Sequence, residues 1–245
     1  MKKALCALLA LVLMLALLPA AYAEYTPVED TPYGLPLLEK PEDFDLEAVI
    51  EGHTLKRMLD LVDNVEVKRE MKQVIQKDKH NMLLDDYYFL EDGQYVNYSI
   101  QTDLSTKQKY KSYQLFLFDK EDPTYYVKYA GGRDKYETDP MMIDYLLETP
   151  IYPSSAEYYD FEITELKEEE NGWITCAFNM TVKPEYIDPD LGDTTTFSDC
   201  SITVDPETGL MRAYTYNSKS EGMEQTFDAE VNYNVDQEPD YSLKY

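Results

Sequence analysis

Histidine, cysteine and tryptophan are scarce in this sequence, and many catalytic and metal sites depend on the first two. Its 245 residues include only two histidines, His53 and His80, and one tryptophan. Of the three cysteines, Cys6 lies in an apolar leader, which leaves Cys176 and Cys200 for the folded chain. Their separation from either histidine excludes zinc-ligand spacing and gives no support for a Cys–His nucleophile pair. We therefore expect no metal site and no enzyme activity.

Two other kinds of site are equally poorly supported. Asp188, Asp190 and Asp193 could attract calcium, but the ligand order and closing glutamate of an EF-hand loop are absent, which favours an acidic surface loop. Gly131-Gly132 is not followed by a helix-forming motif with lysine, so it is not a phosphate-binding loop. We expect no cofactor.

The first 23 residues have the three parts of a secretory signal peptide. Lys2 and Lys3 precede an uncharged apolar run over 4–18, and Ala21-Tyr22-Ala23 supplies the small residues required for cleavage before Glu24. The run is shorter than the roughly 20 residues that span a bilayer, and no later run approaches that length. No cysteine follows the cleavage point for lipid attachment. We expect a secreted or extracytoplasmic protein without a membrane span after cleavage.

The charge balance is strongly acidic. The chain has 22 basic and 48 acidic residues, and loss of the two leader lysines leaves 20 against 48, a net charge of −28. Such a charge repels nucleic acid and anionic headgroups, and it keeps an exported protein soluble. We expect a monomer that does not bind nucleic acid.

Four regions follow one another along the chain. Residues 1–23 form the signal peptide, and 24–43 form a Pro-rich acidic tether, in which four prolines favour extended backbone. A single domain is expected over 44–235, followed by a loose polar tail over 236–245.

The folded region opens with an amphipathic helix expected over 45–63. Asp45 can cap it, and apolar residues at helical spacing form one stripe. Asn64 is a plausible terminator in the left-handed conformation. Residues 65–75 fit either a strand, through alternation with charged residues, or a continued helix, and we favour the strand.

A meander of antiparallel strands is expected next, over 82–90, 94–102, 109–118 and 124–130. Gly131-Gly132 is expected to end this run. Pro140 then opens a short helix over 141–148, since proline is tolerated in a first turn.

Three further strand regions follow in the second half. The hairpin of 160–168 and 173–182 is expected to pair Phe161 with Met180, Ile163 with Phe178, and Glu165 with Cys176. A second hairpin joins 197–204 to 210–217 through a turn in which Gly209 can adopt positive φ. A last strand is expected over 225–233.

Cysteine and tyrosine leave alternatives open. Cys176 and Cys200 fit either a disulfide, which export permits, or two buried thiols. The 23 tyrosines include the pairs Tyr87-Tyr88, Tyr125-Tyr126 and Tyr158-Tyr159, which would put one ring on each face of a strand. They fit either ordinary sheet propensity or a ligand-binding surface.

A resemblance to a known family rests on the order of the elements and on two segments. One is the strand-turn-strand segment Ile202 to Leu210, and the other is the aromatic strand Tyr87-Tyr88-Phe89 before the turn Asp92-Gly93. Over 45–233 the chain resembles the LolA-like and LppX-like superfamily of exported lipoprotein carriers, in particular its uncharacterised Gram-positive members. The resemblance implies a curved half-barrel sheet with helices on its concave side, around an apolar cavity for acyl chains. The lipoprotein cysteine is missing here, so membrane attachment is not implied.

The expected fold class is therefore α+β, a curved antiparallel half-barrel meander with an N-terminal amphipathic helix and a short mid-chain helix. Two functions compete: a non-catalytic binding protein that holds a lipid or other apolar ligand in the half-barrel, and an extracytoplasmic interaction or sensor module whose core is filled by its own side chains. Candidates for a cavity lining are Tyr113, Leu115, Leu117, Phe161, Ile163, Phe178 and Met180.

Overall fold

The computed structural model describes residues 40–75, 78–92, 94–117, 124–129, 132–137, 147–148, 150–152, 155–187, 195–220 and 222–236. For 115–117, 124–129 and 132–137 the backbone alone is described. The expected signal peptide, most of the expected tether and nearly all of the expected tail therefore lie outside the described residues. At the end of the expected tether, Pro41–Asp43 forms a 3₁₀ turn instead of extended backbone.

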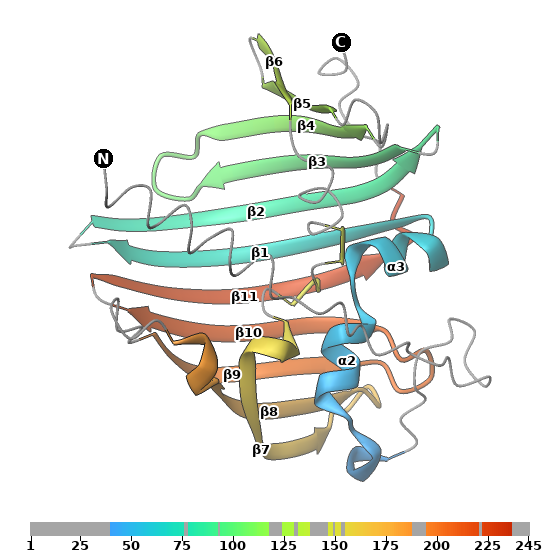
Figure 1. Ribbon diagram of the computed structural model, residues 1–245, viewed down its shortest axis with the longest axis vertical. Helices are drawn as coiled ribbons and strands as arrows, with labels where there is room; N and C mark the ends of the chain where they lie inside the picture. The colour runs from blue at the N-terminus through green and yellow to red at the C-terminus, as the bar shows by residue number, and fades with distance from the viewer. Residues whose placement is uncertain are drawn as a thin grey trace.

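The chain forms one antiparallel sheet whose eleven strands are arranged in the order β6-β5-β4-β3-β2-β1-β11-β10-β9-β8-β7 (Figure 1). This confirms the α+β half-barrel fold class. The bounds are β1 Asn64–Ile75, β2 Asp78–Glu91, β3 Gln94–Asp103, β4 Lys109–Leu117, β5 Thr124–Tyr129, β6 Gly132–Glu137, β7 Tyr159–Glu168, β8 Ile174–Val182, β9 Thr196–Val204, β10 Met211–Ser220 and β11 Met223–Tyr233.

Two meanders make up this sheet, β1 to β6 and β7 to β11, and they join where the first strand pairs with the last. All of the expected strands are present, and 64–75 is a strand, as favoured. One strand was missed: Gly132 begins β6, which pairs with β5, so Gly131-Gly132 does not end the run. Tyr129 pairs with Gly132, and the sequence alone does not distinguish a glycine pair that ends a run of strands from one that lies between two paired strands.

Two short helices replace the single helix expected over 45–63: α2 (Leu46–Gly52) and α3 (Leu55–Leu61). Asp45 caps the first as predicted, its side chain accepting the Ala48 N–H at 3.0 Å. The helix breaks because Thr54 adopts extended backbone and caps the second, accepting the Arg57 N–H at 3.3 Å. Asn64 was expected to end the helix in the left-handed conformation, but it begins β1 instead.

The expected helix over 141–148 falls mainly outside the described residues. Leu147 and Glu148 are helical. Two 3₁₀ turns follow, Ala156–Tyr158 and Pro184–Tyr186. Tyr158 lies in the first of them, so the Tyr158-Tyr159 pair does not place one ring on each face of a strand.

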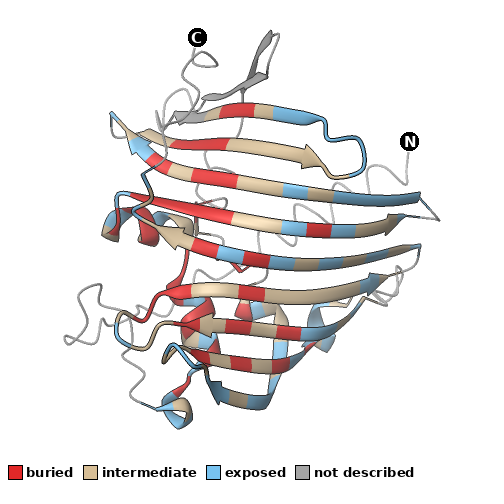
Figure 2. Cartoon of the chain, turned by 180° about the vertical axis from the view of Figure 1, so that it is seen from behind, coloured by how far each residue is buried: buried red, intermediate tan, exposed pale blue. Residues whose placement is uncertain are grey.

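One face of the sheet packs against α2 and α3, and we call it the inner face. Val49 and Ile50 of α2 and Met58 and Leu59 of α3 share a buried cluster with apolar residues of β1 and β8–β11. Burial falls along the strands away from these helices: β1 is fully buried from Asn64 to Val67 and largely exposed near Ile75 (Figure 2). We call the end of the sheet that packs against α2 and α3 the proximal end, and the opposite end, near Ile75, the distal end.

A second buried cluster lies on the opposite, outer face of β2–β4. It contains Tyr87, Phe89, Val96, Tyr98 and Tyr113, with Val235 against it. The strand register separates the two clusters, because Val65 pairs with Tyr88 on the inner face while Asn64 pairs with Phe89 on the outer face. The prediction that Tyr87 and Tyr88 occupy opposite faces is confirmed.

The β7–β8 hairpin shows one change in register. Phe161 pairs with Met180 and Ile163 with Phe178, as predicted. A bulge between Ile163 and Glu165 then shifts the pairing, so Leu166, and not Glu165, lies opposite Cys176. The extra residue is favoured because it keeps the glutamate in solvent and places an apolar side chain on the inner face. Among the described residues, no helix is long and apolar enough to cross a bilayer.

Candidate functional site

The four candidate lining residues from the β7–β8 hairpin lie together at the packed part of the inner face. Phe178 and Met180 are buried, Phe161 packs against them, and Ile163 on the edge strand is 42% exposed. Tyr152 fills the space in front of this group. Its ring centroid lies 6.0 Å from that of Phe178, and its hydroxyl lies 4.0 Å from the Met180 sulfur. Phe161, Phe178 and Met180 therefore belong to the packed core, whereas Ile163 lies at its exposed edge.

The three candidates from β4 do not join this group. Tyr113 is buried in the outer cluster, where its hydroxyl donates to a Glu91 carboxylate oxygen at 2.8 Å. Leu115 and Leu117 follow in the same strand, and their side chains lie outside the described part of the chain. Tyr113 and Phe178 thus lie on opposite faces of the sheet, whereas a shared cavity would have required both on one face. Sequence alternation placed each strand's faces but not which faces of distant strands coincide.

Both cysteines are free and buried on the inner face. Cys176 lies opposite Ile202, while Cys200 lies opposite Phe178, so the two thiols are diagonal neighbours on adjacent strands. Burial raises the pKa of Cys176 to about 12 and that of Cys200 to about 11. Both sulfurs are therefore neutral thiols and poor nucleophiles at neutral pH.

A row of adaptable apolar side chains crosses the distal half of the inner face. Tyr216, Phe227, Met71 and Met82 come from β10, β11, β1 and β2, and the register pairs each with the next. We call these four residues the distal row. The Tyr216 and Phe227 rings stack, with centroids 4.7 Å apart. Sequence reasoning missed this row, because its members come from both ends of the chain.

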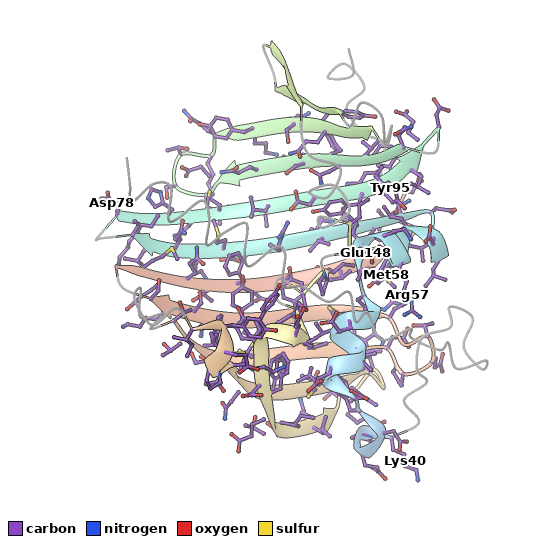
Figure 3. All side chains as sticks on the ribbon, in the orientation of Figure 1. Lys40, Arg57, Met58, Asp78, Tyr95 and Glu148 are labelled. Atoms are coloured by element: carbon purple, nitrogen blue, oxygen red, sulfur yellow. The ribbon has the colours of Figure 1, made fainter. Side chains whose placement is uncertain are left out.

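The distal row lies away from the two helices that fill the proximal half. Arg57 and Met58 of α3 lie at the same, proximal end of the sheet as Tyr95, whereas Asp78, which begins β2, lies at the far end (Figure 3). Tyr216, Phe227 and Met82 are only partly buried. An apolar surface that remains partly exposed on an inner face can take an apolar ligand.

A buried ion pair lies directly beside the distal row. An Arg69 Nη donates to an Asp86 carboxylate oxygen, and both side chains are largely buried. Burial works against the charged form of Arg69, but the neighbouring Tyr214 and Asp86 outweigh it and hold the pKa of the guanidinium above its ordinary value. Burial and then the Asp86 charge raise the pKa of Tyr88, which also lies close to the guanidinium.

Several polar atoms around this ion pair lack a partner among the described residues. The Arg69 Nε, the Tyr214 hydroxyl and the Asn97 Nδ2 are all buried and make no hydrogen bond there. Burial raises the pKa of Tyr214 to about 12, so its hydroxyl keeps its proton. All three atoms can donate at neutral pH, and the Tyr214 oxygen, which lies beside the Arg69 guanidinium, can also accept.

Metal chemistry receives no support from the described residues, in which no three His, Cys, Asp or Glu side chains are grouped to hold an ion. Asp188, Asp190 and Asp193, expected in an acidic surface loop, lie outside them.

Comparison with known proteins gives similarity to solved structures only. No family model matches the sequence, and no curated protein matches it. A DUF1329 family protein from Desulfovibrio piger is 11% identical, with a TM-score of 0.31 over 75% of this chain and 90% of its own. MucB is 12% identical, with a TM-score of 0.38 over 78% of this chain and 60% of the MucB chain.

Proposed function

We propose that this chain is an exported, non-catalytic binding protein that holds a lipid or other apolar ligand against the distal half of the inner face. The observation that carries the proposal is the distal row, in which four apolar side chains from four neighbouring strands lie side by side and three remain partly exposed. Methionine supports varied apolar contacts because its thioether is flexible and polarisable. Tyr152 and the two helices fill the proximal half, and the Tyr152 ring also packs against that of Tyr216, with centroids 6.0 Å apart. The ligand would therefore lie beyond Tyr216, against Phe227, Met71 and Met82.

Titration with diphenylhexatriene, an apolar fluorescent dye, tests the proposal directly. Saturable binding is expected for the mature chain. Met82→Glu should weaken it by more than about tenfold, because a carboxylate in an apolar contact surface must lose its hydration.

The chain provides a matched control in the next residue. Leu83 lies on the outer face of the same strand and is partly exposed, so Leu83→Glu adds the same charge without touching the distal row. Its dye affinity should match that of the unaltered protein. Absence of saturable binding, or equal loss in both variants, would contradict the proposed ligand surface.

The packed proximal core favours a second candidate function. Ile50, Met58, Tyr152, Ile202 and Met211 are fully buried there, as expected of a domain filled by its own side chains that acts through its surface. A protein that fails to bind any apolar probe would be assigned to this interaction or sensor class.

A further inference from the structure

The inner face holds an unsatisfied polar group whose parts come from opposite ends of the chain. Arg69 in β1 and Tyr214 in β10 both flank Ala229 of β11 in the strand register. Each group shifts the pKa of the other, so the guanidinium and the phenol lie close together across the middle strand, where the Tyr152 ring packs edge-on against that of Tyr214. This places two buried donors next to the distal row.

Two unpaired atoms, the Tyr214 hydroxyl and the Arg69 Nε, indicate what kind of group could bind here. Tyr214 is 1% exposed, yet its hydroxyl finds no partner among the described residues, and the same holds for the Arg69 Nε. A buried donor without a partner destabilises the fold, and most buried polar groups in native proteins have a partner. Each atom carries a proton that it can donate, so a hydrogen-bond acceptor would satisfy both.

Charge decides which acceptor fits. Asp86 already neutralises Arg69 through its ion pair. A second carboxylate beside Asp86 would meet like-charge repulsion in a largely buried setting, within a chain that is strongly acidic overall. A neutral carbonyl oxygen accepts the same hydrogen bonds without that repulsion.

On this basis we infer that Arg69 and Tyr214 hold the carbonyl oxygen of an acyl ester whose hydrocarbon chain lies along the distal row. This inference rests on the proposed function, since it names the polar group of the ligand that the distal row binds. Tyr216, next on the inner face after Tyr214 in β10, continues directly into that row, so the carbonyl and the chain of one molecule would reach both.

Three fluorescent apolar probes separate the polar contact from the apolar one. The first is the methyl ester of parinaric acid, which is a fluorescent polyene, and the second is free parinaric acid. The third is diphenylhexatriene, which has no hydrogen-bond acceptor. We expect the mature chain to bind the ester more tightly than the free acid. Tyr214→Phe, which removes only the unpaired hydroxyl, should weaken ester binding about fivefold to tenfold and leave diphenylhexatriene binding unchanged.

Two further variants complete the test. Tyr98→Phe makes the same change on the outer face, where Tyr98 is buried in the other cluster, and should alter no affinity. Arg69→Met with Asp86→Leu removes both charges together, which avoids leaving one buried and unpaired. This double variant should also bind the ester more weakly and keep diphenylhexatriene binding. Urea unfolding checks that each variant is folded.

The failures are distinguishable. If diphenylhexatriene binds but neither inner-face variant changes ester affinity by more than about twofold, the polar contact is wrong and the apolar binding surface stands. If the free acid binds as tightly as the ester, the assignment to a neutral ester is wrong. If no probe binds, the inference and the proposed function both fall.

Discussion

The Nε2 of His53 accepts a hydrogen bond from the backbone N–H of Met211 at 2.9 Å, across 158 residues of sequence. Its Nδ1 lies 2.6 Å from the Val49 carbonyl oxygen and must therefore donate to it. One neutral imidazole thus ties the break between α2 and α3 to the start of β10. Burial, the largest cause, lowers the pKa of His53 to about 4.

This bond predicts a loss of stability in mild acid. The pKa of His53 is about 4 in the folded chain and 6.5 as its ordinary value, so the unfolded chain binds the proton first as the pH falls. The stability contributed by the neutral His53 imidazole is fully present above about pH 6.5 and is lost as the pH falls towards 4. Lowering the pH from about 7.5 to 5 should therefore reduce the free energy of unfolding by about 2 kcal/mol.

Urea unfolding at the two pH values measures this loss. His53→Gln keeps a donor and an acceptor but does not titrate, so its loss over this range should be smaller than that of the unaltered chain. His80→Gln, at an exposed position, is the control. An unaltered chain and a His53→Gln variant with the same pH dependence would show that His53 is not the cause.

A second prediction compares the two members of one cross-strand pair. Phe178 is 2% exposed, whereas its partner Ile163 lies on the exposed edge strand. Phe178→Ala should cost about 3–5 kcal/mol because it leaves a cavity beside Tyr152. Ile163→Ala should cost under about 1 kcal/mol. Equal losses in urea unfolding would contradict this assignment of core and edge.

Reactivity with a thiol reagent provides a third prediction. Cys176 and Cys200 are free and buried, with the pKa of each thiol raised by burial. The native mature chain should react slowly with dithionitrobenzoate, while the unfolded chain should release two equivalents without prior reduction. Purified exported protein that shows no free thiol after unfolding would mean that a disulfide forms.

Cleavage of the leader is the fourth prediction. The pattern Ala21-Tyr22-Ala23 places the cut before Glu24. Amino-terminal sequencing of protein recovered outside the cell should therefore begin at Glu24. Mature protein that still carried residues 1–23 would contradict export by cleavage.

Local pattern was enough to predict most of the strands. Alternation identified β1 despite its fit to a helix, and it placed Tyr87 and Tyr88 on opposite faces. It also paired Ile163 with Phe178 correctly, since both lie close to the turn that sets the register. These features depend on neighbours within one hairpin, which is the range over which side-chain period and turn residues act.

The break at His53 and the bulge before Glu165 required tertiary contacts. The helix ends early because Thr54 pairs with Pro150 and His53 bonds to Met211, which lie far away in sequence. The bulge forms because the inner face accepts Leu166 and excludes a glutamate. Both features depend on contacts with residues distant in sequence, and helical periodicity and strand alternation carry no information about such contacts.

The sequence by itself determined the acidic net charge and the alternating faces of most strands, because each follows from residue type or local order. Only the tertiary structure decided which faces meet. Pairing of β1 with β11 brings Arg69 within reach of Tyr214, and it separates Tyr113 from Phe178 on opposite sides of one sheet. Strand order is set by the burial of whole faces against one another, so a binding surface built from four strands exists only once all four are paired.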